Sequence, residues 1–149
     1  MSNDNLIYED DSAFVFVKED ASAQNQVVVK YKNLTNSGNK FTTSYPSSLI
    51  AKIAKAKTPA WLEDEISREE SEDYLRPVVK NSILSYLKPE NFANKVILDF
   101  GSGAGSSTII LSKLFPDSEI IGVEMVEEFF NIAEERIKFF GLKNVKFVK

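Results

Sequence analysis

The sequence predicts an α/β protein with an incomplete, Rossmann-like parallel sheet, preceded by a helical region and a small antiparallel β ribbon. After residue 90, short apolar runs alternate with stretches of helical periodicity in the order β-α-β-α-β. Before residue 46, aromatic and β-branched residues form short runs between polar turns. We therefore expect right-handed crossovers in the C-terminal part. We also expect a β-rich accessory segment over residues 1–57 and a second domain over residues 58–149.

The N-terminal segment contains three candidate strands, at residues 14–17, 26–31 and, more weakly, 41–45. Residues 36–39, Asn-Ser-Gly-Asn, favour a turn before the third, because Gly and Asn tolerate positive φ. A helix follows over residues 47–57, where the apolar residues have helical spacing.

A helical region is expected from about Ala60 to Leu87. Pro77 lies inside it, which predicts either a kink or two helices with Pro77 in the first turn of the second. One apolar face is expected to comprise Leu75, Val78, Val79, Ile83, Leu84 and Leu87.

Three strands are expected in the C-terminal part. Residues 96–98 form a continuous apolar run, typical of a strand covered on both faces, and residues 120–123 and 145–148 form the next two. Between the first two, a helix is expected whose N-cap is supplied by the hydroxyl residues Ser106, Ser107 and Thr108. Between the last two, a helix is expected with Gly141 as its C-cap. Its apolar stripe comprises Phe129, Phe130, Ala133, Ile137 and Phe140.

The chemically informative segment follows the first of these strands. Gly101, Gly103 and Gly105 occupy alternate positions, so the backbone can turn tightly and a ligand can lie against it. Asp99 comes two residues before the first glycine, where a carboxylate can face an ammonium group. Glu124 ends the second strand, where an acid in a βαβ unit meets the hydroxyls of a ribose.

These residues resemble the class I S-adenosylmethionine-dependent methyltransferases. Asp99 to Gly105 fits the family's first motif, an acid followed by Gly-x-Gly-x-Gly, and Glu124 fits its ribose-binding acid. The resemblance covers about residues 90–149, roughly the first half of a family domain. It implies S-adenosylmethionine as the cofactor and methyl transfer as the activity. The cofactor-binding residues that it implies are Asp99, Gly101, Ser102, Gly103 and Gly105 around the methionine moiety, Glu124 on the ribose and Met125 beside the adenine.

Other interpretations of the glycine loop remain. A dinucleotide-binding domain prefers a glycine at the sixth position of the fingerprint, where this chain has Ser106, and Asp99 would repel a diphosphate. An ordinary α/β turn without a ligand is the third interpretation. A non-catalytic cofactor-binding or interaction module is a further alternative to an enzyme.

Composition excludes several kinds of chemistry. The 149 residues include no cysteine and no histidine, which removes disulfides, thiolate nucleophiles, thiolate zinc sites and the usual base near neutral pH. No metal site is expected. With a net charge of −4, the chain has no overall positive potential that would attract the phosphate backbone of a nucleic acid, although this does not exclude a local basic patch. Without a signal peptide or an apolar run of ~20 residues, a cytoplasmic protein with no membrane partner is expected.

The chain ends after the third predicted strand of the sheet. The outer edge of strand 96–98 would then be unpaired, which favours aggregation unless other strands cover it. Three kinds of partner could pair with this edge: the N-terminal strands, another chain, or the rest of a longer gene product. We favour the last. We therefore expect a truncated chain that has no methyltransferase activity alone. The sequence names no catalytic residue, acceptor or oligomeric state.

Overall fold

The computed structural model describes residues 5–34, 38–82, 85–86 and 88–149 and contains two compact units, residues 1–70 and 71–149. The boundary predicted from the sequence lies earlier, between residues 57 and 58. The physical reason for the later boundary is helix α2 (Leu62–Glu70), which packs on α1 (Ser47–Lys57) and on strand β4 (Gly38–Thr43). Its Leu62 and Ile66 are fully buried.

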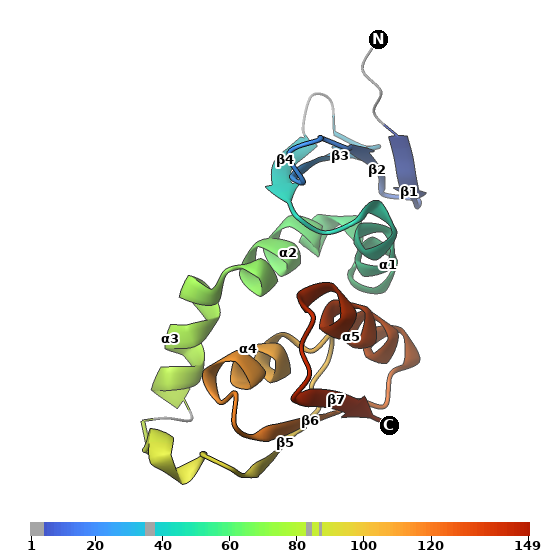
Figure 1. The fold of residues 1–149 in the computed structure, drawn as a ribbon. Coiled ribbons are helices and arrows are strands. Elements are labelled where there is room, and N and C mark those ends of the chain that lie inside the picture. Colours follow the sequence, from blue (N-terminus) through green and yellow to red (C-terminus); the bar gives the residue numbers. More distant parts are fainter. Residues whose placement is uncertain (1–4, 35–37, 83–84, 87) are drawn as a thin grey trace. The chain divides into compact units, whose positions relative to one another are not determined.

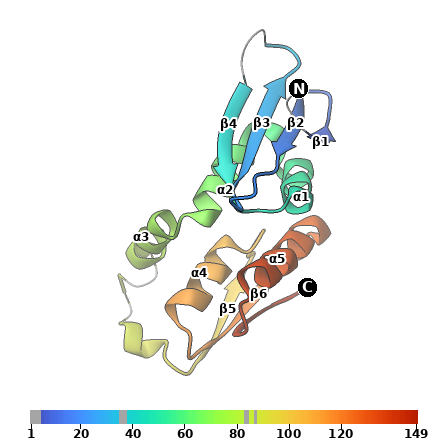
Figure 2. The same ribbon diagram turned by 45° about the horizontal axis from the view of Figure 1, so that its top comes forward.

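Unit 1 contains a four-stranded antiparallel sheet in the order β1-β2-β3-β4, shown side by side in Figure 2. Strands β2 (Ala13–Lys18), β3 (Asn25–Tyr31) and β4 confirm the predicted antiparallel ribbon. The sequence analysis missed β1 (Asn5–Glu9), a short and largely exposed edge strand. Of the predicted turn at residues 36–39, residues 36 and 37 lie outside the described residues.

Strand β2 alternates between a buried face and a more exposed face, as a half-covered strand does. In β2, Ala13, Val15 and Val17 are fully buried, whereas Phe14 and Phe16 are partly exposed. Helix α1 contacts β1 and β2 and confirms the predicted helix over residues 47–57. It buries the apolar positions identified by their spacing: Leu49, Ile50, Ile53 and Ala54.

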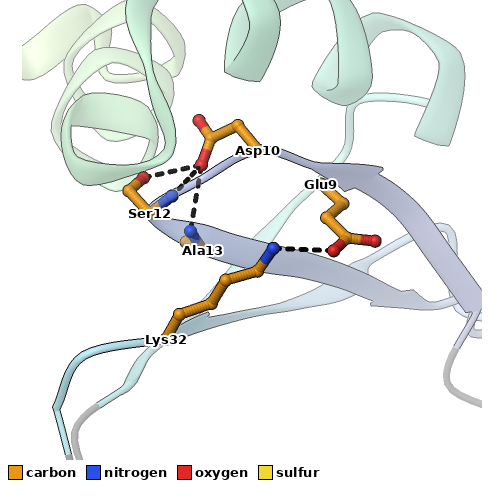
Figure 3. Close-up of polar contacts among 5 residues, drawn as sticks. All are labelled: Glu9, Asp10, Ser12, Ala13 and Lys32. Atoms are coloured by element: carbon orange, nitrogen blue, oxygen red, sulfur yellow. Dashed lines mark hydrogen bonds and ion pairs between the residues drawn. The ribbon is translucent and has the colours of Figure 1, made fainter.

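A carboxylate organises the turn between β1 and β2 (Figure 3). Asp10 Oδ1 accepts hydrogen bonds from the Ser12 amide (2.7 Å), the Ser12 hydroxyl (2.7 Å) and the Ala13 amide (2.9 Å). These bonds favour the ionised form, so the pKa of Asp10 lies below its ordinary value, and the Ser12 hydroxyl is the largest cause.

We expect Asp10→Ala to lower the free energy of unfolding of unit 1 by about 1 kcal/mol, because two backbone donors and a hydroxyl lose their acceptor. The folded-state pKa is depressed, so the contribution is present above the unfolded pKa and is lost as the pH falls through the folded pKa. The difference between wild type and variant should therefore shrink below about pH 4. Urea denaturation across pH 3–7 measures this, with Asp10→Asn as a matched control that keeps one oxygen acceptor.

Unit 2 begins with helix α3 (Glu72–Ser82). The helical region from Ala60 is broken between α2 and α3 at Ser71 rather than at Pro77, which lies inside α3 instead of in its first turn. On the predicted apolar face, Val79 is buried but Val78 is 50% exposed, so that part of the prediction is wrong. Residues 83, 84 and 87 lie outside the described residues.

The C-terminal part confirms the predicted β-α-β-α-β order and the incomplete Rossmann-like sheet. Strands β5 (Val96–Phe100), β6 (Glu119–Val123) and β7 (Val145–Val148) pair in parallel in that order. Helices α4 (Ser106–Leu114) and α5 (Glu127–Phe140) connect them and lie on the same side of the sheet (Figure 1). This is the arrangement that two right-handed crossovers in one direction produce.

The other side of this sheet is uncovered. In β5, Val96 is 61% exposed, Leu98 53% and Phe100 75%. The prediction that residues 96–98 form a strand covered on both faces is therefore wrong for the described part of the chain. The helical side contains the core of unit 2, which comprises Val79, Phe92, Ile110, Leu111, Phe115, Ile120, Ala133, Val145 and Phe147.

Candidate functional site

The glycine loop, residues 101–105, connects the carboxyl end of β5 to α4. The Gly101 and Ser102 amides donate to the Val123 carbonyl, at 2.9 and 3.1 Å, so the loop is fastened to the end of β6. The φ angles of Gly101, Gly103 and Gly105 are +70°, +57° and +88°, a region that residues with a side chain rarely adopt. The prediction of a sharp turn after the strand is confirmed.

The three glycines have different surroundings. A Cβ built at Gly101 or Gly103 would meet no heavy atom within 4 Å. A Cβ at Gly105 would lie 2.6 Å from the Phe147 ring. The first two glycines therefore leave open space beside the backbone, whereas Gly105 is required by packing.

Glu124, immediately after β6, holds the loop through its carboxylate. Its Oε2 accepts from the Gly103 amide at 2.8 Å, and its Oε1 accepts from the Val126 amide at 2.7 Å. Glu124 is only 8% exposed. A buried carboxylate is stabilised by hydrogen bonds to its charged form, and these two amides supply them.

Asp99 lies on the helical side of β5, paired in register with Gly122 of β6. Its Oδ2 accepts a hydrogen bond of 2.6 Å from the buried Thr108 hydroxyl in the first turn of α4. The sequence analysis assigned this hydroxyl, with those of Ser106 and Ser107, to capping. That is wrong: the N-cap is Gly105, which has no side-chain cap.

Arg136 of α5 is a component that the sequence analysis missed. Its side chain is fully buried, and Nη1 donates to the Ala104 carbonyl at 2.8 Å and to the Ser106 hydroxyl at 3.2 Å. The guanidinium therefore holds the C-terminal side of the glycine loop, opposite the bond from Glu124. One sequence signal could have identified Arg136: it is a charged residue one turn after Ala133, on the buried face of the helix. A buried arginine normally has polar partners, so its position indicates a specific contact.

Two further predicted residues differ in their surroundings. Met125 is 77% exposed at the end of β6. The Ser102 hydroxyl oxygen is buried and has no hydrogen-bond partner among the described residues. A buried hydroxyl of this kind is a candidate for a bond to a bound molecule.

The structure thus places the predicted acids and glycines at one end of the parallel sheet. Asp99, Gly122 and Glu124 lie along neighbouring strands, and the Glu124 carboxylate reaches the loop. Ligands of open α/β sheets bind at the carboxyl ends of the strands. The open space at Gly101 and Gly103, together with the buried Ser102 hydroxyl, fits a small polar ligand lying against the main chain.

Three further observations concern other parts of the molecule. A hollow of about 380 Å³ lies at the opposite end of this sheet, beside Asp117, Glu119, Lys143 and Lys146. Among the described residues, no group of acidic side chains is arranged to hold a metal ion. No helix in the described ranges is long and apolar enough to cross a bilayer.

The parallel sheet, the glycine loop after its first strand and the acid after its second define an incomplete Rossmann-like unit. Residues 91–149 match the model of a family described as a methyltransferase domain. This match agrees with the resemblance of the glycine loop and the two acids to the class I S-adenosylmethionine-dependent methyltransferases.

Two curated relatives of this chain are both named as methyltransferases. The release factor glutamine methyltransferase of Buchnera aphidicola subsp. Baizongia pistaciae (strain Bp) is 38% identical over 71 residues, which are 48% of this chain and 25% of the relative. The ribosomal RNA small subunit methyltransferase H of Thermotoga neapolitana is 34% identical over 68 residues, or 46% of this chain and 22% of the relative. The chain therefore spans about a quarter of the length of these relatives.

Solved structures give matches of the same kind. A SAM-dependent methyltransferase from Aquifex aeolicus is 30% identical, with 53% of this chain and 46% of that chain covered and a TM-score of 0.35.

Proposed function

We propose that unit 2 binds S-adenosylmethionine at the glycine loop and that the chain forms part of a methyltransferase. The observation that carries the proposal is the Glu124 carboxylate, which is buried beside a side-chain-free turn and bonded to its Gly103 amide. When bound, the cofactor would supply a methyl group from its sulfonium sulfur, and the remaining neutral thioether is the leaving group. The protein's part is to hold the cofactor and exclude water.

The electrostatics favour a ligand with a cationic centre. Asp99 and Glu124 bring two carboxyl groups to the site, and a diphosphate would be repelled by them. In the proposal, Asp99 faces the amino group of the methionine moiety, and Gly101 and Gly103 allow that moiety to lie against the main chain. The Ser102 hydroxyl supplies a further polar contact.

Glu124 then has two roles. Its carboxylate positions the loop by accepting a hydrogen bond from the Gly103 amide, and it accepts hydrogen bonds from the ribose hydroxyls of the cofactor. An ionised carboxylate offers about four lone-pair directions, so two amide bonds do not exhaust its capacity as an acceptor. The exposed Met125 supplies apolar surface for the adenine ring.

The acceptor of the methyl group is left open by the relatives, since one is named for a glutamine in a protein and the other for ribosomal RNA. No residue of unit 2 is assigned as a base. The proposed activity therefore belongs to the whole protein, and the site described here accounts for cofactor binding.

We expect Glu124→Ala to weaken binding of S-adenosylmethionine and S-adenosylhomocysteine at least about tenfold, since ribose hydroxyls and the Gly103 amide lose their acceptor. Isothermal titration calorimetry on the 149-residue chain measures this. Glu128→Ala is the matched control, because Glu128 is exposed on the first turn of α5.

A 2′-deoxyribose analogue of S-adenosylhomocysteine separates the two tasks of Glu124. Wild type should bind the analogue less tightly than it binds S-adenosylhomocysteine. The Glu124→Ala variant should bind the two compounds with equal affinity. If wild type does not distinguish the two compounds, the ribose assignment is wrong. If the folded wild-type chain binds neither cofactor, the proposed function is wrong.

A further inference from the structure

We propose that the helix-free face of the unit 1 sheet binds single-stranded RNA. This inference is independent of the cofactor site, because it concerns unit 1 alone. The face is defined by Phe14 and Phe16 of β2 and by the residues that share their side of the sheet in the strand register. Its exposed or partly exposed members are Leu6, Glu9, Phe14, Phe16, Lys18, Lys30 and Lys40, together with Lys32 just after β3, whereas Val28 on the same side is buried.

Two aromatic rings lie at the centre of this face. Phe14 and Phe16 are alternate residues of β2, an internal strand, and their ring centroids are 6.2 Å apart. Both side chains are partly exposed, although Ala13, Val15 and Val17 between and beside them are completely buried. A solvent-facing aromatic pair on a four-stranded sheet offers stacking surfaces for unpaired bases.

An ammonium group lies over each ring. Lys30 Nζ lies 5.0 Å from the centroid of the Phe16 ring, and Lys32 Nζ lies 4.5 Å from that of Phe14. Lys18 and Lys40 are exposed on the same face, with Lys40 opposite Val28 in the register of β3 and β4. Cations beside a stacking surface match the phosphates that flank each stacked base.

The local charge contrasts with that of the whole chain. The face carries four lysines and Glu9, whose carboxylate accepts a bond from Lys32 Nζ at 2.7 Å (Figure 3). The chain as a whole has a net charge of −4. A positively charged face on an acidic chain is complementary to a polyanion, and the aromatic pair favours a polyanion with bases.

Among nucleic acids, RNA is the one that is commonly single-stranded and so presents unpaired bases. Loops, bulges and ends of RNA expose bases that can leave their own stack, whereas bases of duplex DNA are stacked inside the helix. On binding, each base would take the position over a phenylalanine ring that a lysine now holds, and the ammonium groups would turn to the phosphates.

The test uses fluorescence anisotropy of a labelled, unstructured RNA of about 12 nucleotides with the full chain, at a series of salt concentrations. We expect the double substitution Phe14→Leu and Phe16→Leu to weaken binding at least about tenfold, because leucine preserves apolar volume but cannot stack. Replacing Lys18, Lys30 and Lys40 with Gln should lower the slope of log K against log salt by about 2. Replacing the exposed Lys55, Lys138 and Lys143 with Gln changes the total charge equally and should leave binding unchanged.

Circular dichroism establishes that each variant is folded, so that a loss of binding is not caused by unfolding of the sheet. Absence of RNA binding by wild type overturns the proposal, as does binding that survives loss of both rings. Equal or tighter binding of the matched single-stranded DNA overturns the assignment to RNA. Binding of phosphatidylserine vesicles without RNA binding would assign the face to an anionic membrane instead.

Discussion

Gly105→Ala is expected to lower the stability of unit 2 by about 2–5 kcal/mol. A positive φ costs a residue with a side chain about 1–2 kcal/mol, and forcing a methyl group into a filled core costs about 1–3 kcal/mol more. Both apply at Gly105, where φ is +88° and a Cβ would lie 2.6 Å from the Phe147 ring and 3.1 Å from the Ala133 Cβ. The substitution therefore disrupts the junction between the glycine loop and the core.

Gly101→Ala is the matched control. Its φ is +70°, but a Cβ there meets no heavy atom within 4 Å. It should cost only the backbone strain of about 1–2 kcal/mol. Hydrogen exchange of unit 2 amides measures both effects, with unit 1 amides as an internal reference. Adding Phe147→Leu to Gly105→Ala should recover part of the loss. If the two alanine variants are equally destabilised, packing against Phe147 is not the cause.

Arg136→Ala is expected to destabilise unit 2 by about 3 kcal/mol, because it removes a large buried side chain and leaves the Ala104 carbonyl without its donor. The Arg136 side chain is completely buried, and its bond to this carbonyl is 2.8 Å. The glycine loop would then lose the Arg136 bond on its C-terminal side and keep the Glu124 bond to the Gly103 amide.

Two further substitutions separate packing from positioning. Arg136→Met preserves much of the apolar stem and removes a buried charge, so unit 2 should stay folded while the amides of Gly105 and Ile109 exchange faster. Arg136→Lys retains a donor and should fall between wild type and methionine in amide protection. Hydrogen exchange of these two amides measures the effect. Unchanged protection in the methionine variant would contradict a positioning role for the guanidinium.

The candidate site was predictable where chemistry depends on residue type and order. Alternate glycines after an apolar run required a turn, and the structure has one with positive φ at each glycine. Acids after the first and second strands were expected at one edge of the sheet, and Asp99 and Glu124 lie at neighbouring strand ends. That these residues bind a cofactor stays a prediction until a titration is made.

The specific contacts were not predictable, because they join residues distant in sequence. Thr108 was interpreted as a cap, since a hydroxyl near a helix start usually bonds to an amide. It instead donates to Asp99, and the N-cap is Gly105. Arg136 lies within the predicted helix before Gly141, yet its side chain reaches across to Ala104. Neither pairing has a local periodicity or spacing that marks it.

By itself, the sequence determined the α/β class, the order of strands and helices from Val96 onward, and the resemblance of the C-terminal part to a methyltransferase domain. These follow from hydrophobic periodicity and from glycines and acids at fixed spacing, which are local properties of the chain. Only the tertiary structure decided that α2 packs with unit 1, that one side of β5 is uncovered, and that Arg136 and Glu124 hold the glycine loop. Burial and hydrogen-bond partners depend on which distant segments meet, and a one-dimensional pattern does not specify that.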